Sequence, residues 1–336
     1  MTKEWTVESI LDMARSFQTA CVLGAAVDLD VFDALAGGPQ TASALAQKRE
    51  TDIRGMTVLL DALAALELID KKGETYAMPP SVAPLLTSAG EKSVLAMAQH
   101  SANCMRRWGQ LAKVVKTGRP AGQFPSVRGE DADAAAFIGA MHNVSGPVAD
   151  EVIRAIQPLE FNHLLDVGGA SGTWTKAFLK ACPSATATIF DLPHVIPMAE
   201  QRLVQAGLDR RVQTVAGDFM EELLPSGADL AWVSAIVHQN SRTENRHLFA
   251  KVYQALTDGG RIAVRDILMD ETRTKPSAGA LFAVNMLVAT EGGGTFTFDE
   301  LHEDLQAAGF RDVVLARRDE VWMHSIITAV KTGGAS

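Results

Sequence analysis

The chain has 336 residues, of which 47% are hydrophobic, and a formal net charge of −9. This length and apolar content allow two domains with substantial cores, and the negative charge argues against a nucleic-acid partner. No apolar stretch is long enough to span a membrane, the N-terminus lacks a signal-peptide layout, and the three dispersed cysteines have no metal-binding spacing. We therefore expect a cytoplasmic protein without a membrane contact or a metal site.

The first hundred residues are predicted to be mostly helical. An apolar helix is expected over Val7–Leu35, a short capped helix over Thr41–Ala46, and a second helix, with apolar residues at helical spacing, over Asp52–Leu68. Leu68–Tyr76 follows as two short strands around a glycine turn. This order of elements is typical of a winged helix, so a DNA-binding role has to be weighed.

The charges of the second helix argue against DNA binding. It carries Arg54 together with Asp52, Asp61 and Glu67, so the helix that would enter a DNA groove is net acidic. Phosphates repel such a surface, and we do not expect a nucleic acid as partner.

The middle of the chain is again helical in pattern. Helices are expected over Val94–Val115 and Ala134–Ile156, and the segment Gly118–Gly129, rich in glycine and proline, separates them.

A glycine-rich turn between a strand and a helix is the most informative feature of the sequence. The apolar run from His163 ends in Asp166, glycines follow at 168, 169 and 172, and Thr173–Ala181 is predicted to be a helix. Glycine allows the backbone to approach a ligand closely, and a helix start offers unpaired N–H groups. The layout predicts a nucleotide-type site at the carboxyl end of a parallel strand.

A dinucleotide site is the first alternative for this turn. Its Gly-x-Gly-x-x-Gly fingerprint would need glycines in place of Ala170 and Thr173 in one register, and of Ser171 and Trp174 in the other. Both registers fail, so an NAD-dependent oxidoreductase is not favoured.

Two further strands end in residues suited to a nucleoside. Ala185–Phe190 ends in Asp191, whose carboxylate can accept both hydroxyls of a ribose. Val212–Ala216 ends in Gly217-Asp218-Phe219, where Asp218 can accept from an adenine amino group with the Phe219 ring beside it.

The next two strands add a histidine and a charged pair. The apolar strand Asp229–Val237 ends in His238, and the strand Arg261–Val264 is followed by Arg265 and Asp266. Acidic, glycine and histidine residues thus collect at the carboxyl ends of successive strands, where open α/β sheets bind ligands.

The end of the chain predicts an antiparallel addition to this sheet. Val313–Ala316 and Val321–Val330 both have strand patterns, and only Arg317–Glu320 separates them. So short a link cannot form a parallel crossover and predicts a hairpin.

Taken together, these motifs resemble those of the S-adenosylmethionine-dependent small-molecule O-methyltransferases. The matching segments are Asp166-x-Gly-Gly-Ala-Ser-Gly, Phe190-Asp191-Leu192-Pro193, Gly217-Asp218-Phe219 and Val237-His238. The resemblance covers nearly the whole chain and includes plant caffeate-type, acetylserotonin-type and bacterial antibiotic-pathway enzymes.

The resemblance implies an α/β fold in two domains. Residues 1–105 would form a helical, winged-helix-like dimerisation domain, and residues 106–336 a doubly wound, seven-stranded methyltransferase sheet with a terminal antiparallel hairpin. It also implies a homodimer that acts on a small-molecule substrate.

The resemblance implies S-adenosylmethionine as cofactor and assigns residues to it and to the substrate. The cofactor-binding set is Asp166, Gly168, Gly169, Gly172, Asp191, Leu192, Gly217, Asp218, Phe219 and Ser234. The substrate-binding candidates are Trp108, Phe137, Met141, His142, Arg265, Asn285 and Met286, each of which can equally be an ordinary packing residue.

Methyl transfer to a hydroxyl requires removal of a proton, and His238 is the candidate general base. Relatives often place an acid at the end of the next strand to orient this base, but here Arg265 falls at or beside that position, with Asp266 next. A second orienting acid is replaced within Gly292–Thr295, unless Glu291 serves. A base without a firm orienter is weaker, which puts O-methylation of a phenol in doubt.

Two alternatives therefore stay open. An arginine facing the pocket would suit an anionic acceptor, and S-methylation of a thiol or thioether acid would need no base, unless Arg265 pairs with Asp266 or Asp270 instead. The other alternative is a non-catalytic regulator that binds the cofactor.

Overall fold

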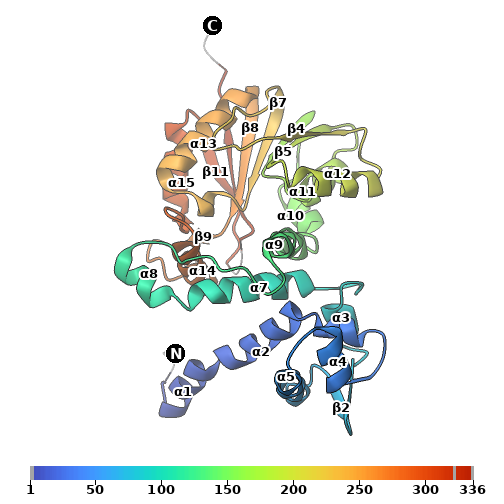
Figure 1. Ribbon diagram of the computed structural model, residues 1–336. Helices are drawn as coiled ribbons and strands as arrows, with labels where there is room; N and C mark the ends of the chain where they lie inside the picture. The colour runs from blue at the N-terminus through green and yellow to red at the C-terminus, as the bar shows by residue number, and fades with distance from the viewer. Residues whose placement is uncertain (1–3, 321–322, 334–336) are drawn as a thin grey trace. The chain divides into compact units, whose positions relative to one another are not determined.

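The computed structural model describes residues 4–320 and 323–333 (Figure 1). The chain forms two compact units. The N-terminal unit comprises the chain up to Gly109 together with Gln123–Asn143, and the C-terminal unit comprises Gln110–Gly122 and the chain from Val144 onward. The chain thus passes between the units more than once, and the expected boundary between residues 105 and 106 stays a prediction.

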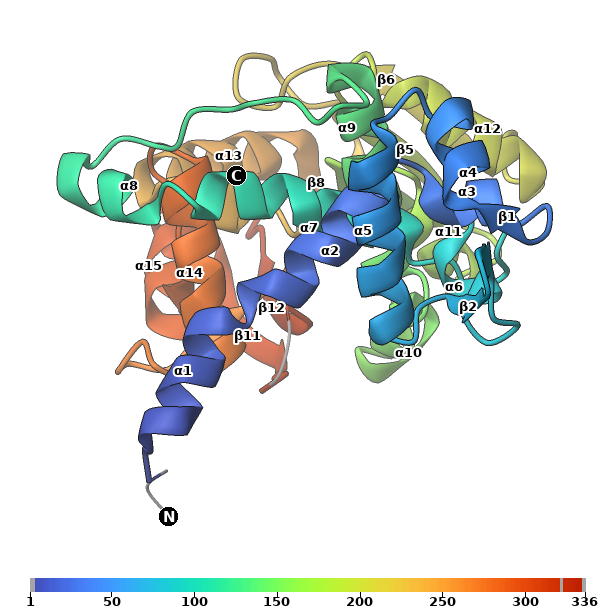
Figure 2. The ribbon, with the colours of Figure 1, turned by 60° about the horizontal axis from the view of Figure 1, so that its bottom comes forward.

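Helices dominate the N-terminal unit. Their bounds are α1 (Val7–Arg15), α2 (Phe17–Asp28), α3 (Val31–Leu35), α4 (Ala42–Lys48), α5 (Ile53–Ala65), α6 (Ala83–Leu86), α7 (Leu95–Trp108) and α9 (Glu130–Ser145). Figure 2 shows α1 and α2 in a nearly continuous run. A capping box starts α1, in which Thr6 and Ser9 bind each other's backbone N–H groups.

The single helix expected over Val7–Leu35 is wrong, because three helices occupy this range. The Ser16 hydroxyl donates to the Met13 carbonyl at 2.8 Å where α1 ends. Asp30, with a left-handed φ of 49°, separates α2 from α3. Two other expected helices are also split, Val94–Val115 into α7 and α8 (Leu111–Thr117) and Ala134–Ile156 into α9 and α10 (Ala149–Ala155).

A helix pair and a small sheet complete the N-terminal unit. The side chain of Thr41 caps α4 by accepting from Ala44 N, and that of Asp52 caps α5 by accepting from Gly55 N at 2.7 Å. The strands β1 (Gln40–Thr41), β2 (Asp70–Lys72) and β3 (Thr75–Ala77) pair antiparallel in the order β1-β3-β2. This arrangement is the winged-helix-like one expected.

A seven-stranded sheet organises the C-terminal unit. Its order is β11-β12-β8-β7-β4-β5-β6. The bounds are β4 (His163–Val167), β5 (Thr186–Asp191), β6 (Val212–Ala216), β7 (Ala228–Ser234), β8 (Leu256–Asp266), β11 (Arg311–Arg317) and β12 (Ser325–Val330). The strands β4 to β8 run parallel, and the chain reverses its direction of winding between β6 and β7, so β4 and β7 mark the switch point.

The sheet ends in the expected antiparallel hairpin. Strand β12 lies between β8 and β11 and pairs antiparallel with both. Its first residue, Ser325, is opposite Asp266, the last residue of β8. The start of β12 therefore lies at the carboxyl edge of the parallel strands. The expected strand began at Val321; residues 321–322 lie outside the described residues, and β12 starts at Ser325.

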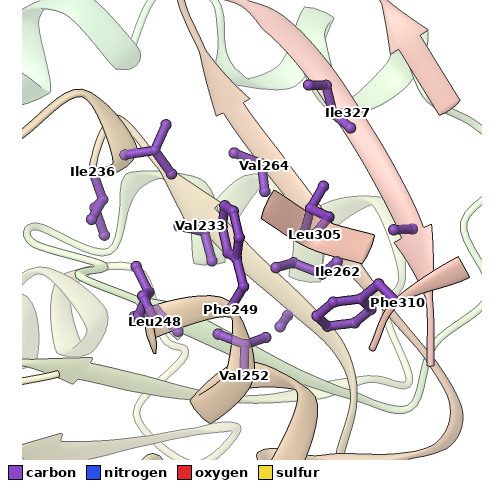
Figure 3. Packing of buried hydrophobic residues seen from close by; sticks show 14 of the residues in the cluster. Val233, Ile236, Leu248, Phe249, Val252, Ile262, Val264, Leu305, Phe310 and Ile327 are labelled. Atoms are coloured by element: carbon purple, nitrogen blue, oxygen red, sulfur yellow. The ribbon is translucent and has the colours of Figure 1, made fainter. Parts of the chain in front are cut away.

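Helices cover both faces of this sheet (Figure 1). We call the face against α13 (Arg242–Ala255) and α15 (Phe298–Ala307) the α13 face, and the face against α10, α11 (Thr173–Ala181) and α12 (Ile196–Gln205) the α11 face. Figure 3 shows the α13-face core, where Phe249 and Val252 of α13 meet Val233 and Ile262 of the sheet. Side chains alternate along each strand, so neighbouring residues of one strand serve different faces.

The remaining elements lie near the carboxyl edge. They are β9 (Leu268–Met269), α14 (Ser277–Ala289) and β10 (Phe296–Thr297), with β9 and β10 paired in parallel. Helices α8 and α14 lie side by side (Figures 1 and 2), and Ala121 N donates to Val288 O at 2.9 Å beside them. Within the described part of the chain, no helix is both long and apolar enough to cross a membrane.

Candidate active site

The glycine turn lies between β4 and α11, as the sequence predicts. Gly168 and Gly172 have left-handed φ values of 64° and 71°. A Cβ at Gly169 would lie 2.9 Å from the Cγ of Asp166, so a side chain there would collide with that carboxyl. The turn therefore requires glycine in order to wrap closely around Asp166.

Asp166 is almost fully buried on the α11 face, with 1% of its surface exposed. Its Oδ2 accepts from the Thr175 hydroxyl at 2.6 Å. Burial raises the pKa of this carboxyl to about 7, and the negative charge of Asp191 adds to the rise. A carboxyl that titrates near neutrality at a sheet edge is typical of a functional site.

Asp191, the last residue of β5, stabilises the glycine turn through a hydrogen bond to its backbone. Its Oδ2 accepts from Ala170 N at 2.7 Å, and its Oδ1 accepts from Leu192 N at 2.7 Å. Burial raises the pKa of Asp191, and these two backbone N–H groups oppose the rise. An ionised carboxylate offers about four lone pairs, so each oxygen keeps capacity for a ligand hydroxyl.

The segment after β6 lies beside this turn. Gly217 N donates to Asp191 O, and a Cβ at Gly168 would come within 3.9 Å of the Phe219 ring. The Asp218 Oδ1 accepts from Met220 N at 2.8 Å. The glycine turn, Asp191 and Phe219 thus form one continuous surface at the carboxyl edge.

His238 lies outside the strand to which the sequence assigned it. Strand β7 ends at Ser234, and His238 is in a short 3₁₀ turn, η1 (Val237–Gln239). The strand stops because Ala235 has a left-handed φ of 58°, although its N–H still donates to Arg265 O. The carbonyl of His238 accepts from Gly294 N at 2.9 Å, which holds the turn in place.

Asp266, the last residue of β8, orients the His238 ring. The Nδ1 of His238 lies 3.0 Å and 2.9 Å from the two oxygens of Asp266, and both side chains are buried. The Phe282 ring of α14 meets the imidazole edge to face at 4.8 Å between centroids. In the tautomer that carries its proton on Nδ1, the N–H donates to this carboxylate and Nε2 keeps a free lone pair.

This pair corrects the expectation that the base lacks an orienting acid. Strand alternation places Asp266 on the α13 face with Ile262 and Val264, and Arg265 on the opposite face. Glu291 is exposed, and among the described residues Asp266 supplies the only carboxylate bound to the His238 ring.

Arg265 is buried on the α11 face and does not share a face with His238. Its Nε donates to Ser234 Oγ at 2.7 Å, and its Nη1 donates to Met323 O at 2.8 Å and to His324 Nδ1 at 2.9 Å. The guanidinium also lies over the Trp174 ring, 4.5 Å from the centroid. No carboxylate of the described residues lies within 4 Å of it, so the alternative in which Arg265 pairs with Asp266 or Asp270 is wrong.

The other substrate candidates are divided between the two units. Asn285 and Met286 are on α14 in the C-terminal unit, with Met286 buried. The remaining four are in the N-terminal unit, on α7 (Trp108) and on α9 (Phe137, Met141 and His142). Phe137 is 44% exposed and contacts the His100 ring. Their role as pocket residues stays a prediction.

Two contacts of the site were not predicted from the sequence. Thr175 is the third residue of α11, the helix that follows the glycine turn, but nothing in the sequence marks its hydroxyl as the partner of Asp166. Phe282 belongs to an apolar helix whose orientation the sequence does not determine. The placement of Asp266 on the face of His238, in contrast, could have been predicted by counting alternate residues along β8.

Comparison with known proteins identifies the family. The model of the O-methyltransferase domain matches residues 108–311, and that of the O-methyltransferase dimerisation domain matches residues 11–88. The tetracenomycin polyketide synthesis 8-O-methyltransferase of Streptomyces glaucescens is 32% identical over 90% of this chain and 91% of its own length. The acetylserotonin O-methyltransferase of Gallus gallus is 30% identical over 93% and 94% of the two chains.

The fold comparison agrees with the sequence comparison. The crystal structure of human N-acetylserotonin methyltransferase in complex with S-adenosylmethionine superposes with a TM-score of 0.77 at 28% identity, and covers 99% of this chain and 100% of that one. The expected fold class, enzyme class and cofactor are confirmed, and neither S-methylation nor a non-catalytic regulator is favoured. The chain therefore belongs to the S-adenosylmethionine-dependent O-methyltransferases, enzymes in which a dimerisation domain precedes the methyltransferase domain.

Proposed function

We propose that this enzyme methylates a hydroxyl group of a small, largely uncharged acceptor, with His238 as the general base and Asp266 as its orienting acid. The observation that carries the proposal is the pair of short contacts between His238 Nδ1 and the Asp266 carboxylate. The arrangement is that of a base held in one tautomer by a buried acid.

The glycine turn and the carboxylates around it are proposed to hold the cofactor, which supplies an activated sulfonium methyl group when bound. Asp166 would accept from the ammonium of its amino-acid end, beside the backbone of Gly168, Gly169 and Gly172. Asp191 and Leu192 would bind the ribose. Asp218 and Phe219 would bind the adenine, and Gly217 would allow the backbone to approach it closely. Ser234, at the end of β7, is the last residue of the proposed cofactor-binding set. The donor set fits this ligand, because carboxylates, backbone N–H groups and an aromatic ring lie along one edge.

The proposed chemistry at His238 is the removal of one proton. The Nε2 lone pair would take the hydroxyl proton of the acceptor as its oxygen bonds to the methyl carbon, and the methyl–sulfur bond would break so that S-adenosylhomocysteine leaves. The imidazolium then formed is stabilised by Asp266, and general-base assistance of this kind contributes about 10²–10⁴-fold to the rate.

Two observations support an uncharged acceptor. The guanidinium of Arg265 is bound to Ser234, Met323 and His324, on the opposite face from His238, so it is not available to an anionic substrate there. The ring beside His238 is Phe282, and apolar residues dominate α14, with Asn285 and Met286 as proposed pocket residues. We also propose substrate-binding residues on the helical segments α7 and α9, namely Trp108, Phe137, Met141 and His142.

We also infer that the working unit is a homodimer. Helix α1 buries none of its residues within the chain, and large apolar side chains of this region are exposed: Val7 is 80% exposed and Phe17, at the start of α2, is 57% exposed. A second subunit would cover such side chains. These side chains belong to the region that matches the dimerisation model or adjoin it. Sedimentation equilibrium should give twice the chain mass, and a monomer at micromolar concentration would contradict this inference.

Turnover of a hydroxyl acceptor tests the proposed base. In a screen of phenols and other hydroxyl compounds with labelled cofactor, His238→Ala should lower kcat about 10²-fold or more for any acceptor that the wild type methylates. His163→Ala is the matched control, because His163 lies at the opposite end of β4 and binds Thr186 and Thr188. Turnover of His238→Ala at the wild-type rate would overturn the assignment.

A further inference from the structure

The buried guanidinium of Arg265 is not explained by the proposed chemistry. Only 2% of its surface is exposed, and its hydrogen bonds go to neutral acceptors, a hydroxyl, a carbonyl and an imidazole. Burial lowers the pKa of the guanidinium to about 10, which still leaves it charged at neutral pH. A buried charge without a carboxylate at contact distance is costly and calls for a reason.

The residues that contact Arg265 are neighbours, along the chain or across the sheet, of residues at Asp166. Ser234, which accepts from Arg265, directly follows Val233, and Val233 pairs with Val167, the neighbour of Asp166. Trp174, under the guanidinium, is followed by Thr175, whose hydroxyl donates to Asp166. Both residues are therefore on the α11 face at the same edge of the sheet, with one strand between them.

We propose that Arg265 is a positioning residue for the cofactor: its fixed positive charge favours the ionised form of Asp166, the form that can accept the ammonium of the cofactor with a negative charge. The proposal rests on the cofactor role of Asp166 given above. A protonated carboxyl offers one acceptor fewer and no charge to a cation, so the ionisation of Asp166 decides how well it binds.

The groups that face Asp166 act on its ionisation in opposite directions. Asp191 of β5 opposes its ionisation, and burial does so more strongly. The Thr175 hydroxyl of α11 favours ionisation by donating a hydrogen bond, and Arg265 of β8 favours it to a smaller extent through its positive charge. The residues of β7 that lie beside Asp166 on this face, Trp232 and Ser234, are neutral. With the pKa of Asp166 near 7, both forms of the carboxyl are present at neutral pH, so loss of the Arg265 charge would shift the group toward its protonated form.

The network also holds Arg265 in place. His324 accepts from the guanidinium through Nδ1, and burial together with the Arg265 charge lowers the pKa of His324 to about 4. The imidazole therefore stays neutral and remains an acceptor over the working pH range. The cation consequently does not move or lose its partners while Asp166 titrates.

Calorimetric binding of S-adenosylhomocysteine between pH 5.5 and 9 tests the proposal. This product keeps the ammonium end and cannot react. In the wild type the affinity should fall below about pH 7 as Asp166 takes up a proton. In Arg265→Met the midpoint of this acid limb should move to higher pH, because the Arg265 charge favours the ionised form of Asp166. Arg265→Lys, which keeps the charge, should stay near the wild-type midpoint.

Matched variants separate the possible outcomes. Arg261→Met, at an exposed position of the same strand, should leave the profile unchanged. Arg265→Gln provides a second neutral variant that retains a hydrogen-bond donor if Arg265→Met does not fold. Weaker binding by the same factor at every pH, with an unmoved midpoint, would overturn the proposal, because Arg265 would then act only on packing or directly on the ligand.

Asp166→Asn distinguishes failure of this inference from failure of the proposed function. If Asp166→Asn binds S-adenosylhomocysteine as tightly as the wild type at every pH, then the cofactor role of Asp166 is wrong and the inference falls with it. If Asp166→Asn abolishes the acid limb while Arg265→Met leaves it in place, only the role of Arg265 is wrong.

Discussion

Two neighbouring residues of strand β8 serve opposite faces of one sheet. Asp266 points to the α13 face and binds His238, while Arg265 points to the α11 face, at the edge that holds Asp166. We propose that the first face serves proton transfer and that the second serves the binding of a cation. The alternation of a β-strand places these two neighbouring side chains on different faces, while the charge of Asp266 still acts on Arg265.

The two faces also differ in how their charged and polar side chains interact. On the α13 face, an acid and a base are in direct contact. On the α11 face, Asp166 and Arg265 interact through their fields without an ion pair within 4 Å, and both are desolvated. We therefore expect substitutions on the α13 face to change the rate of catalysis, and substitutions on the α11 face to change cofactor affinity and its pH dependence.

The largest expected effect is on the α13 face. Asp266→Asn should lower kcat by about 10²-fold or more, since the amide neither fixes the productive tautomer nor stabilises the imidazolium. Steady-state kinetics with saturating cofactor measure this effect. Asp258→Asn, at an exposed position of the same strand, is the control. An unchanged kcat in Asp266→Asn would show that His238 does not depend on its partner.

A smaller effect is expected on the stability of the cofactor-free protein. The pKa of Asp166 rises from 3.8 to about 7 on folding, so the native state holds this proton more tightly than the unfolded chain. The stabilisation from that proton is complete below about pH 4 and is lost as the pH rises through about 7. Asparagine has no charge to bury, so Asp166→Asn should gain on the order of 2–4 kcal/mol relative to the wild type between pH 4 and pH 8.

Urea unfolding of both proteins at the two pH values measures this difference. A parallel pH dependence in the wild type and in Asp166→Asn would mean that Asp166 is ionised equally easily in the folded and unfolded chains. The expected result would show that the wild type gives up stability at neutral pH at the site where it binds its cofactor.

Much of the site could be predicted from the sequence because its signals are local. The glycine turn after β4 and the acid at the end of β5 are set by residues close together in the chain, and the structure places them at one edge. The hairpin at the end of the sheet followed from the short link between two strand patterns.

The predictions that failed concern features that depend on backbone conformation or on contacts between distant segments of the chain. The end of β7 is set by the left-handed Ala235, which is held by the carbonyl of Arg265. The burial of Arg265 depends on Met323 and His324, almost sixty residues further along the chain. The N-terminal helix is divided at Asp30 by a backbone conformation that no apolar pattern announces.

Binding of S-adenosylhomocysteine to His238→Ala and to Asp166→Asn at pH 8, measured by calorimetry, tests most directly whether the two faces have separate tasks. We expect His238→Ala to bind within about twofold of the wild type and Asp166→Asn to bind at least about tenfold more weakly, as loss of a charge-assisted hydrogen bond implies. Equal losses in the two variants, or tight binding by Asp166→Asn, would contradict the division between the α13 face and the α11 face.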